Sequence, residues 1–192
     1  MYTLKAEKRS MDVKAKRLRR EGFVTGNLYG KDFPGSVPLK MKQLDASSLL
    51  KTSNKGSQIM LDIEGKTYEV LIKDIVFNSM VNRIEEIDFQ TLVSNEKVHS
   101  VAEIIMVNAD KVVSGVPQET LKEIAYRALP SALIDRINID VGDMKVGDTL
   151  RVRDLDIAKN KDITLITPLD DLVITVTAVH NNVPVTEEET AE

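Results

Sequence analysis

The stretch Gln58 to Phe77, QIMLDIEGKTYEVLIKDIVF, decides the fold class. Its apolar Leu61 and Ile63 alternate with the acidic Asp62, which is the period-2 pattern of a strand with one buried face. Turn residues at Glu64 to Lys66 then separate this run from a second β-prone run. The stretch therefore predicts a β-hairpin, and with it a β-rich domain.

The residues on the N-terminal side of the hairpin extend this domain and add two helices. The segment VKAKRLRREG has the spacing of a short helix and ends at Gly22, a residue type that commonly terminates helices. A second helix is expected to begin with Asp45 as its N-cap and to end near residues 54–56. Further strands are predicted at residues 2–7, 27–29 and 37–41.

The C-terminal half consists mostly of β-branched runs that Gly, Asp and Asn turns separate. Such runs fall within residues 99–115, 136–155 and 169–179 and predict sheet. The segment LKEIAYRAL, residues 121–129, fits two patterns: Leu121, Ile124 and Ala125 have helical spacing, whereas Ile124, Tyr126 and Ala128 alternate. Periodicity alone favours a helix there.

The two halves of the chain carry opposite net charges. Residues 1–92 carry +4, from 11 Lys and 5 Arg against 6 Asp and 6 Glu, whereas residues 93–192 carry −8. The first twenty residues alone contain eight Lys or Arg, with Glu7 and Asp12 as their acids. A basic half attracts polyanions and an acidic half is repelled by them, so the two halves should face different partners.

Polar residues around Val93 to Lys97 follow a strand-like run close to this change of sign. We place a domain boundary there. The expected organisation is an N-terminal domain over residues 1–93, a β-rich C-terminal domain over 94–182 and an acidic disordered tail over 183–192.

Composition excludes several classes of protein. The chain has no Cys, which excludes disulfides, thiolate nucleophiles and cysteine-ligated metals and permits a reducing compartment such as the cytosol. Its N-terminal residues contain no apolar signal region, and no run approaches 18 apolar residues. We therefore expect neither secretion nor a membrane partner.

No arrangement of side chains indicates catalysis. His99 and His180 stand in unrelated strand-like segments, without a carboxylate at a ligand or triad spacing. The segment GDMKVGD lacks the spacing of a phosphate loop and is typical of turns. Glu85 and Glu86 are adjacent, so a regular strand would point them to opposite faces. We expect no catalytic residue, no metal and no cofactor.

The segment Lys14 to Phe23, KAKRLRREGF, has five basic side chains and one acid. One interpretation is a solvated helix face, with Leu18 inward and Arg17 paired to Glu21 at i,i+4. The other is a nucleic-acid contact, in which the cations bind phosphates next to the aromatic Tyr29. A short helix reads an RNA groove only where mismatches widen it, and otherwise follows the backbone. Charge alone leaves both interpretations open.

Several motifs, taken in order and spacing, are more specific. The first half contains RLRREG, LYG, VLIKDI and EIDFQ, and the second half GVPQETLKEIAYRALP, INIDVGDMKVGDTLRVRDL and LVITVTA. Together they resemble the bacterial large-subunit ribosomal protein L25, in the long two-domain form that includes the general stress protein CTC. The resemblance covers roughly residues 2 to 180.

The resemblance implies a β-rich α+β fold and a non-enzymatic function. The N-terminal domain would be a six-stranded β-barrel with helices, similar to the anticodon-binding barrels of glutaminyl-tRNA synthetase, followed by a mostly β C-terminal domain. Residues 118–128 would be strand instead of helix. The protein would be a cytoplasmic, ribosome-associated structural component that binds 5S rRNA and contacts other large-subunit proteins. The implied RNA-binding positions are Lys16, Arg17 and Arg19 in the helix, Tyr29 in the loop, and Lys73, Asp74 and Asp88 on strands, with Lys14, Arg20 and Arg83 as further cations.

This chain departs from the family pattern where RNA contacts are expected. Residues 11–13 are Met-Asp-Val instead of the usual Gly-Lys-Gly, and Thr25 replaces a proline. Residues 76–79 are Val-Phe-Asn-Ser where relatives are polar or basic with a proline, and Glu86 stands where a histidine is common. These changes remove or reverse phosphate and base contacts.

The departures support a second hypothesis beside 5S rRNA binding. The chain could be a diverged stress-type paralogue with weakened 5S rRNA binding, whose C-terminal domain contacts protein partners. Off the ribosome we expect a monomer, because the acidic half repels its own copy.

Overall fold

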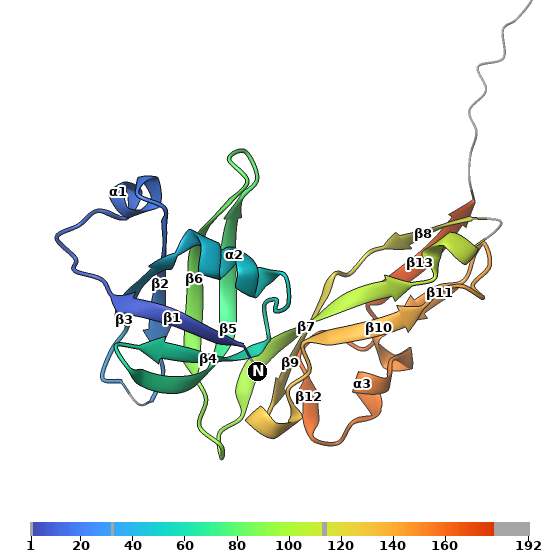
Figure 1. The fold of residues 1–192 in the computed structure, drawn as a ribbon. Helices are drawn as coiled ribbons and strands as arrows, with labels where there is room; N and C mark the ends of the chain where they lie inside the picture. The colour runs from blue at the N-terminus through green and yellow to red at the C-terminus, as the bar shows by residue number, and fades with distance from the viewer. Residues whose placement is uncertain (1, 32, 113–114, 179–192) are drawn as a thin grey trace, which may run out of the picture.

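The computed structural model describes residues 2–31, 33–112 and 115–178. The predicted acidic tail, residues 183–192, and His180 lie outside the described residues. Figure 1 shows a barrel formed by the first half of the chain beside two sheets formed by the second half. The β-rich architecture is as the sequence predicts.

Six strands close the N-terminal barrel in the order β1-β3-β2-β6-β5-β4. The pairs β1–β4 and β2–β6 are parallel, and the remaining neighbours are antiparallel. The six-stranded barrel implied by the resemblance is therefore confirmed. The strands are β1 (Thr3–Lys8), β2 (Phe23–Tyr29), β3 (Val37–Lys42), β4 (Gln58–Ile63), β5 (Lys66–Asn78) and β6 (Arg83–Thr91).

The hairpin that decides the fold class forms as predicted. β4 and β5 pair from Gln58 opposite Leu71 to Ile63 opposite Lys66, and Ile59, Leu61 and Ile63 are buried in the barrel. The turn at Glu64 and Gly65 has positive φ at both residues (53° and 85°), which two-residue hairpin turns of the matching twist require. The alternation in the sequence is thus the inward and outward alternation of a barrel wall.

Two helices pack on the barrel, α1 (Ala15–Arg20) and α2 (Gln43–Leu50). Gly22 follows α1 with φ 87°, so the predicted terminator is confirmed. The prediction that Asp45 caps α2 is wrong, because the helix begins at Gln43 and Asp45 lies in its first turn. The N–H of Gln43 donates to the Gly22 carbonyl at 3.0 Å, so strand β3 runs directly into the helix without a side-chain cap.

The second half of the chain forms two further sheets around a separate apolar core. Their strand orders are β10-β7-β9-β12 and β11-β13-β8, which confirms a mostly β region. The strands are β7 (Val98–Val107), β8 (Gly115–Glu119), β9 (Glu123–Ala128), β10 (Arg136–Asp140), β11 (Thr149–Arg151), β12 (Ile163–Leu165) and β13 (Leu172–Ala178). The short helix α3 (Asp156–Lys159) and three single-turn segments, η1 (Ala109–Lys111), η2 (Pro130–Ala132) and η3 (Val152–Asp154), connect them.

The ambiguous segment 121–129 is strand, and the helical reading of its periodicity is wrong. Ile124, Tyr126 and Ala128 are all fully buried, so the alternating pattern is the one that faces the core. Strands β8 and β9 cover most of residues 118–128, with a break at residues 120–122. The Tyr126 hydroxyl also donates to the Ile134 carbonyl at 2.6 Å and accepts from its N–H at 2.7 Å, which satisfies its polar atom inside the sheet region.

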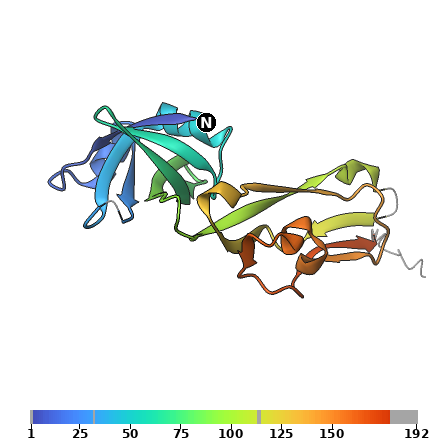
Figure 2. The same ribbon diagram turned by 90° about the horizontal axis from the view of Figure 1, so that it is seen from below.

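Polar contacts join the barrel to the C-terminal sheets, which lie beside it along the long axis (Figure 2). Gln58 donates to the Pro130 carbonyl at 2.6 Å, Ser57 to an Asp135 carboxylate oxygen at 3.1 Å and Arg136 to the Thr52 carbonyl at 3.4 Å. The division into domains at residue 93 stays a prediction. In the part of the chain that the structure describes, no helix is long and apolar enough to cross a membrane.

Barrel closure between β2 and β6 predicts the effect of one substitution. A Cβ on Gly26 would lie 2.2 Å from the Ile87 carbonyl oxygen, so Gly26→Ala must push the two strands apart. We expect it to lower the free energy of unfolding in urea by about 1–3 kcal/mol, as overpacking does elsewhere. Gly35→Ala is the control, because nothing lies within 4 Å of a Cβ there. Equal stabilities for the two variants would contradict the tight β2–β6 approach.

Candidate nucleic-acid interface

The cations of α1 lie on its outer face. Leu18 is buried and holds the helix on the barrel, while Lys14, Lys16, Arg17 and Arg20 are exposed. Arg17 donates to Glu21 at 2.8 Å, and this hydrogen bond raises the pKa of the Arg17 guanidinium. Among the described residues, no ion pair involves the other three cations. The helix therefore presents positive charge to solvent, as a phosphate-binding surface does.

Arg19 differs from the other cations of the helix because it points back onto the barrel. Its Nε donates to the Glu85 carbonyl at 3.1 Å and its Nη2 to the Thr25 hydroxyl at 3.3 Å. Its guanidinium also lies 3.6 Å from a Glu85 carboxylate oxygen and 3.7 Å from one of Glu86. Because the Arg19 side chain is only 22% exposed, it holds α1 in place more than it faces a partner.

The pairing of β5 with β6 explains how both acids reach Arg19. The register shifts so that Val76 lies opposite Glu86 and Phe77 opposite Ile84, which leaves Glu85 as an extra residue in a β-bulge. The expectation that Glu85 and Glu86 point to opposite faces is therefore wrong, because it assumed a regular strand.

Arg83 completes this attachment of the helix. Its Nη1 donates to the Arg19 carbonyl at 2.9 Å, at the C-terminal end of α1, where a cation also interacts favourably with the helix dipole. Arg83, which the sequence offers as an RNA contact, thus has a structural partner.

A polar row crosses the outer surface of β2, β6 and β5. Asn27 pairs with Asp88 in the parallel register, and Asp88 lies opposite Asp74. The Asn27 amide donates to Glu86 at 3.2 Å and to Asp88 at 3.1 Å. Carboxylates in such a row can accept hydrogen bonds from base amino groups.

Tyr29 lies at the end of the same row. Burial raises the pKa of its hydroxyl, and the negative charges of Asp88 and then Asp74 raise it further. The ordinary tyrosine pKa is already near 10, so the hydroxyl stays protonated at neutral pH and can donate a hydrogen bond. The structure therefore brings together three residues that the sequence predicts, Tyr29, Asp74 and Asp88.

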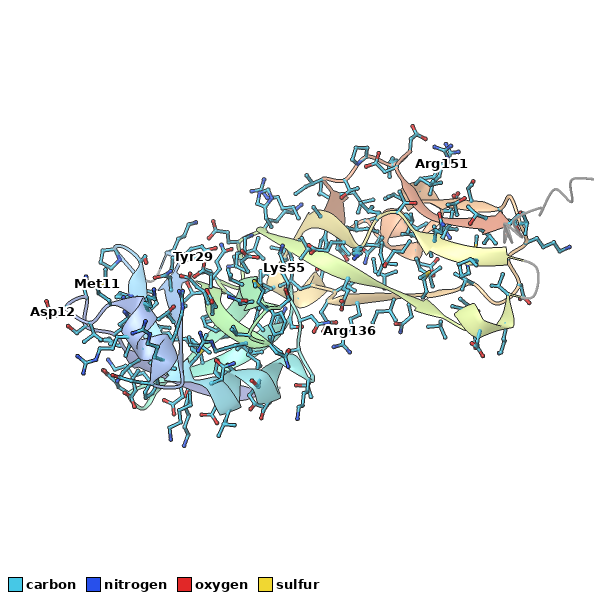
Figure 3. All side chains as sticks on the ribbon, turned by 90° about the horizontal axis from the view of Figure 1, so that it is seen from above. Met11, Asp12, Tyr29, Lys55, Arg136 and Arg151 are labelled. Carbon is cyan, nitrogen blue, oxygen red and sulfur yellow. The ribbon has the colours of Figure 1, made fainter. Side chains whose placement is uncertain are left out.

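Lys73, by contrast, points toward the C-terminal sheets. Its ammonium donates to the His99 carbonyl of β7 at 2.8 Å, and burial, followed by repulsion from Lys55, lowers its pKa. Lys55 itself bridges Asp74 at 3.6 Å and Glu123 of β9 at 3.3 Å. Lys73 thus belongs to the contacts between the barrel and the sheets. Figure 3 shows Lys55 at this junction and Tyr29 on the nearby barrel wall.

The loop that departs from the family pattern lies before α1. Figure 3 places Met11 and Asp12 at the end of the barrel distant from the C-terminal sheets. The Asp12 carboxylate is exposed and accepts a hydrogen bond from the Ser10 hydroxyl at 2.8 Å, and the Met11 side chain is exposed as well. An anion thus stands two residues before Lys14, where it weakens attraction to phosphate.

The sequence did not single out Thr25 or Asn27 as groups that organise this surface. Thr25 is almost fully buried, and its hydroxyl donates to the Glu85 carbonyl at 3.2 Å while accepting from Arg19. Both residues lie on β2 and donate hydrogen bonds to β6, which pairs with β2 in parallel although the two segments are about 60 residues apart. No local pattern signals such a pairing. Among the described residues, no group of three or more His, Asp or Glu side chains could hold a metal ion.

Both halves of the chain are similar to known ribosomal proteins. Residues 4–89 match the Ribosomal L25p family, and residues 97–180 match the C-terminal domain of ribosomal protein TL5. A large ribosomal subunit protein bL25 from Halothermothrix orenii is 33% identical over 202 residues, covering 98% of this chain and 89% of that protein. The bL25 of Akkermansia muciniphila is 30% identical over 80% of this chain and 78% of its own length. That of Thermoanaerobacter sp. strain X514 is 26% identical, with 85% and 82% covered.

The attachment of α1 predicts different effects for two neighbouring arginines. Arg19→Ala removes hydrogen bonds that the Glu85 carbonyl and Thr25 receive, and we expect the free energy of unfolding in urea to fall by about 1–3 kcal/mol. Arg17→Ala, on the exposed face, should leave that free energy unchanged. If both variants unfold alike, Arg19 does not hold the helix.

Proposed function

Because the chain belongs to the family of the bacterial large ribosomal subunit protein bL25, in its two-domain form, we propose that it binds 5S rRNA through the outer surface of its barrel. Membership of this family makes it a structural protein of the large ribosomal subunit, not an enzyme, and places it on cytoplasmic ribosomes. The proposal concerns which RNA it binds and with which residues.

The observation that carries the proposal is that α1 is attached to the strands that bear the polar row. The helix supplies Lys14, Lys16 and Arg20, and Arg17 together with its partner Glu21, as a basic surface. Tyr29 and Asp88 lie on the adjacent strands, which are tied to α1 through Arg19 and Glu86. RNA recognition needs phosphate contacts for position and base contacts for specificity. Here the cations suit the phosphates, and the neutral hydroxyl and the carboxylates suit base edges.

An irregular RNA helix fits this surface better than a regular one. A-form RNA has a deep, narrow major groove and a wide, shallow minor groove. A helix of six residues, Ala15–Arg20, enters the narrow major groove only where mismatched pairs widen it. Elsewhere it lies against the phosphates. We propose that α1 contacts phosphates and that Tyr29, Asp74 and Asp88 contact bases exposed in the minor groove.

The second half of the chain is proposed to face other ribosomal proteins. Its net charge of −8 over residues 93–192 disfavours contact with RNA. The hydrogen bonds of Ser57, Gln58 and Lys73 fix the adjoining sheets against the barrel. When the barrel binds RNA, these sheets therefore keep a fixed orientation relative to the barrel.

The function is tested by measuring the affinity of the full chain for 5S rRNA across a salt series. Replacing two of the four exposed cations, Lys16→Ala with Arg17→Ala, should weaken binding and lower the log–log salt slope by about two, one for each lost phosphate contact. The matched control replaces two exposed lysines of the acidic half, Lys145→Ala with Lys161→Ala, and should bind like the wild type. Weak binding that neither pair changes, and that does not depend on the RNA, would favour the diverged paralogue.

We also expect the free protein to be a monomer, because its acidic half repels a second copy. Sedimentation velocity at physiological salt should give a single species with the mass of one chain. A stable dimer at micromolar concentration would contradict this expectation.

A further inference from the structure

The end of the β5–β6 hairpin, from the last residues of β5 into the turn, carries an unusual group of exposed apolar side chains. Val76 is 46% exposed, Phe77 52%, Met80 96% and Val81 57%. These four are clustered within six residues, although only eleven large apolar residues are exposed in the whole described part of the chain. We call residues 76–81 the apolar tip. A contiguous apolar patch on a protein surface commonly marks a contact site.

The apolar tip has a defined conformation. The Met80 N–H donates to the Asn78 side-chain oxygen at 3.1 Å, and the Asn78 amide donates to Glu85 at 2.9 Å. Asn82 closes the turn with φ 47°, a conformation that asparagine tolerates better than most residues. The backbone of such an ordered turn loses little conformational entropy on binding.

The β-bulge at Glu85 places the apolar tip relative to the barrel. In a regular strand successive side chains alternate between the two faces, yet Val76 and Phe77 are both exposed. The register shift between them turns the end of the hairpin away from the core. The tip therefore projects from the barrel, at the end where α1 also lies (Figure 1).

The same contacts that hold α1 connect it to the apolar tip. Arg83, two residues after the tip, donates to the Arg19 carbonyl of α1, and Arg19 donates to the Glu85 carbonyl in the bulge. These hydrogen bonds fix the position of α1 relative to the strand that follows the tip. Residues 75–82 contain no acid, so nothing within the tip repels a polyanion.

Because Arg83 and Arg19 fix the basic helix relative to the hairpin that carries the tip, we propose that the apolar tip, through Phe77 and Met80, packs against an unstacked base of the same RNA whose phosphates α1 binds. The proposal rests on the proposed function and names a further contact for it. Aromatic side chains stack on bases, and methionine is among the apolar residues that proteins insert between bases. An unpaired nucleotide beside the groove is the chemical group that this surface would take.

Stacking differs from phosphate binding in its salt dependence, and this difference provides the test. Phe77→Ser in the full chain should weaken binding to 5S rRNA about tenfold at every salt concentration, without a change in the log–log slope. Met80→Ser should weaken binding in the same manner. Phe77→Tyr keeps the ring and should bind like the wild type. Val116→Ser, which replaces an exposed apolar side chain of the C-terminal sheets, is the control for loss of surface apolarity. Urea unfolding of each variant establishes that the fold is kept.

The Lys16→Ala with Arg17→Ala variant, measured alongside, separates the two proposals. If it binds more weakly while Phe77→Ser and Met80→Ser bind like the wild type, the base contact is overturned and 5S rRNA binding stands. If none of these variants is weakened, both proposals fail. If Phe77→Ser leaves RNA affinity intact but lowers co-sedimentation with large ribosomal subunits, the tip contacts a ribosomal protein, which also overturns the base contact.

Discussion

The parallel approach of β2 to β6 is the constraint on which the rest of the N-terminal surface depends. Gly26 allows it, because any side chain there would collide with the Ile87 carbonyl. The pairing sets Asn27 beside Asp88 and brings the Thr25 hydroxyl to the Glu85 carbonyl. Since α1 leads directly into β2, the position of β2 also decides where the basic helix lies. One backbone contact thus positions cations, carboxylates and the tyrosine together.

This arrangement divides the basic residues between two tasks. Arg19 and Arg83 attach α1 to β6, whereas Lys14, Lys16 and Arg20 remain exposed. A surface with few exposed cations gains less from counterion release than the net count of Lys and Arg suggests. In the proposed RNA complex, the carboxylates of the polar row and the uncharged tip would contribute the larger share of the specificity, because base edges and base faces carry the sequence and shape information.

At the junction between the barrel and the C-terminal sheets, cations are again paired and not free for a partner. Lys73 and Lys55 stand among Asp74, Glu123 and the His99 carbonyl, so two barrel cations are engaged on acidic-half partners. Exposed ion pairs of this kind contribute little to stability individually. Together with the hydrogen bonds of Ser57 and Gln58, they fix the direction in which the acidic sheets extend from the barrel, away from the proposed RNA surface.

The sequence by itself determined the local elements: the hairpin at residues 58–77, the helix ending at Gly22, and the opposite charges of the two halves. These follow from neighbouring residues, since alternation, turn residues and composition act over a few positions. Periodicity misjudged residues 121–129, where two patterns overlap and only burial against the sheet selects one. The N-cap preference of aspartate wrongly placed the start of α2 at Asp45. Only the tertiary structure decided that Arg19 faces inward, that Glu85 and Glu86 share a side and that Lys73 belongs to the junction. It also decided that the apolar tip projects from the barrel. Each of these depends on β2, β5, β6 and β7 meeting across long stretches of chain and on a bulge, and a pairing register is a property of two segments that neither encodes alone.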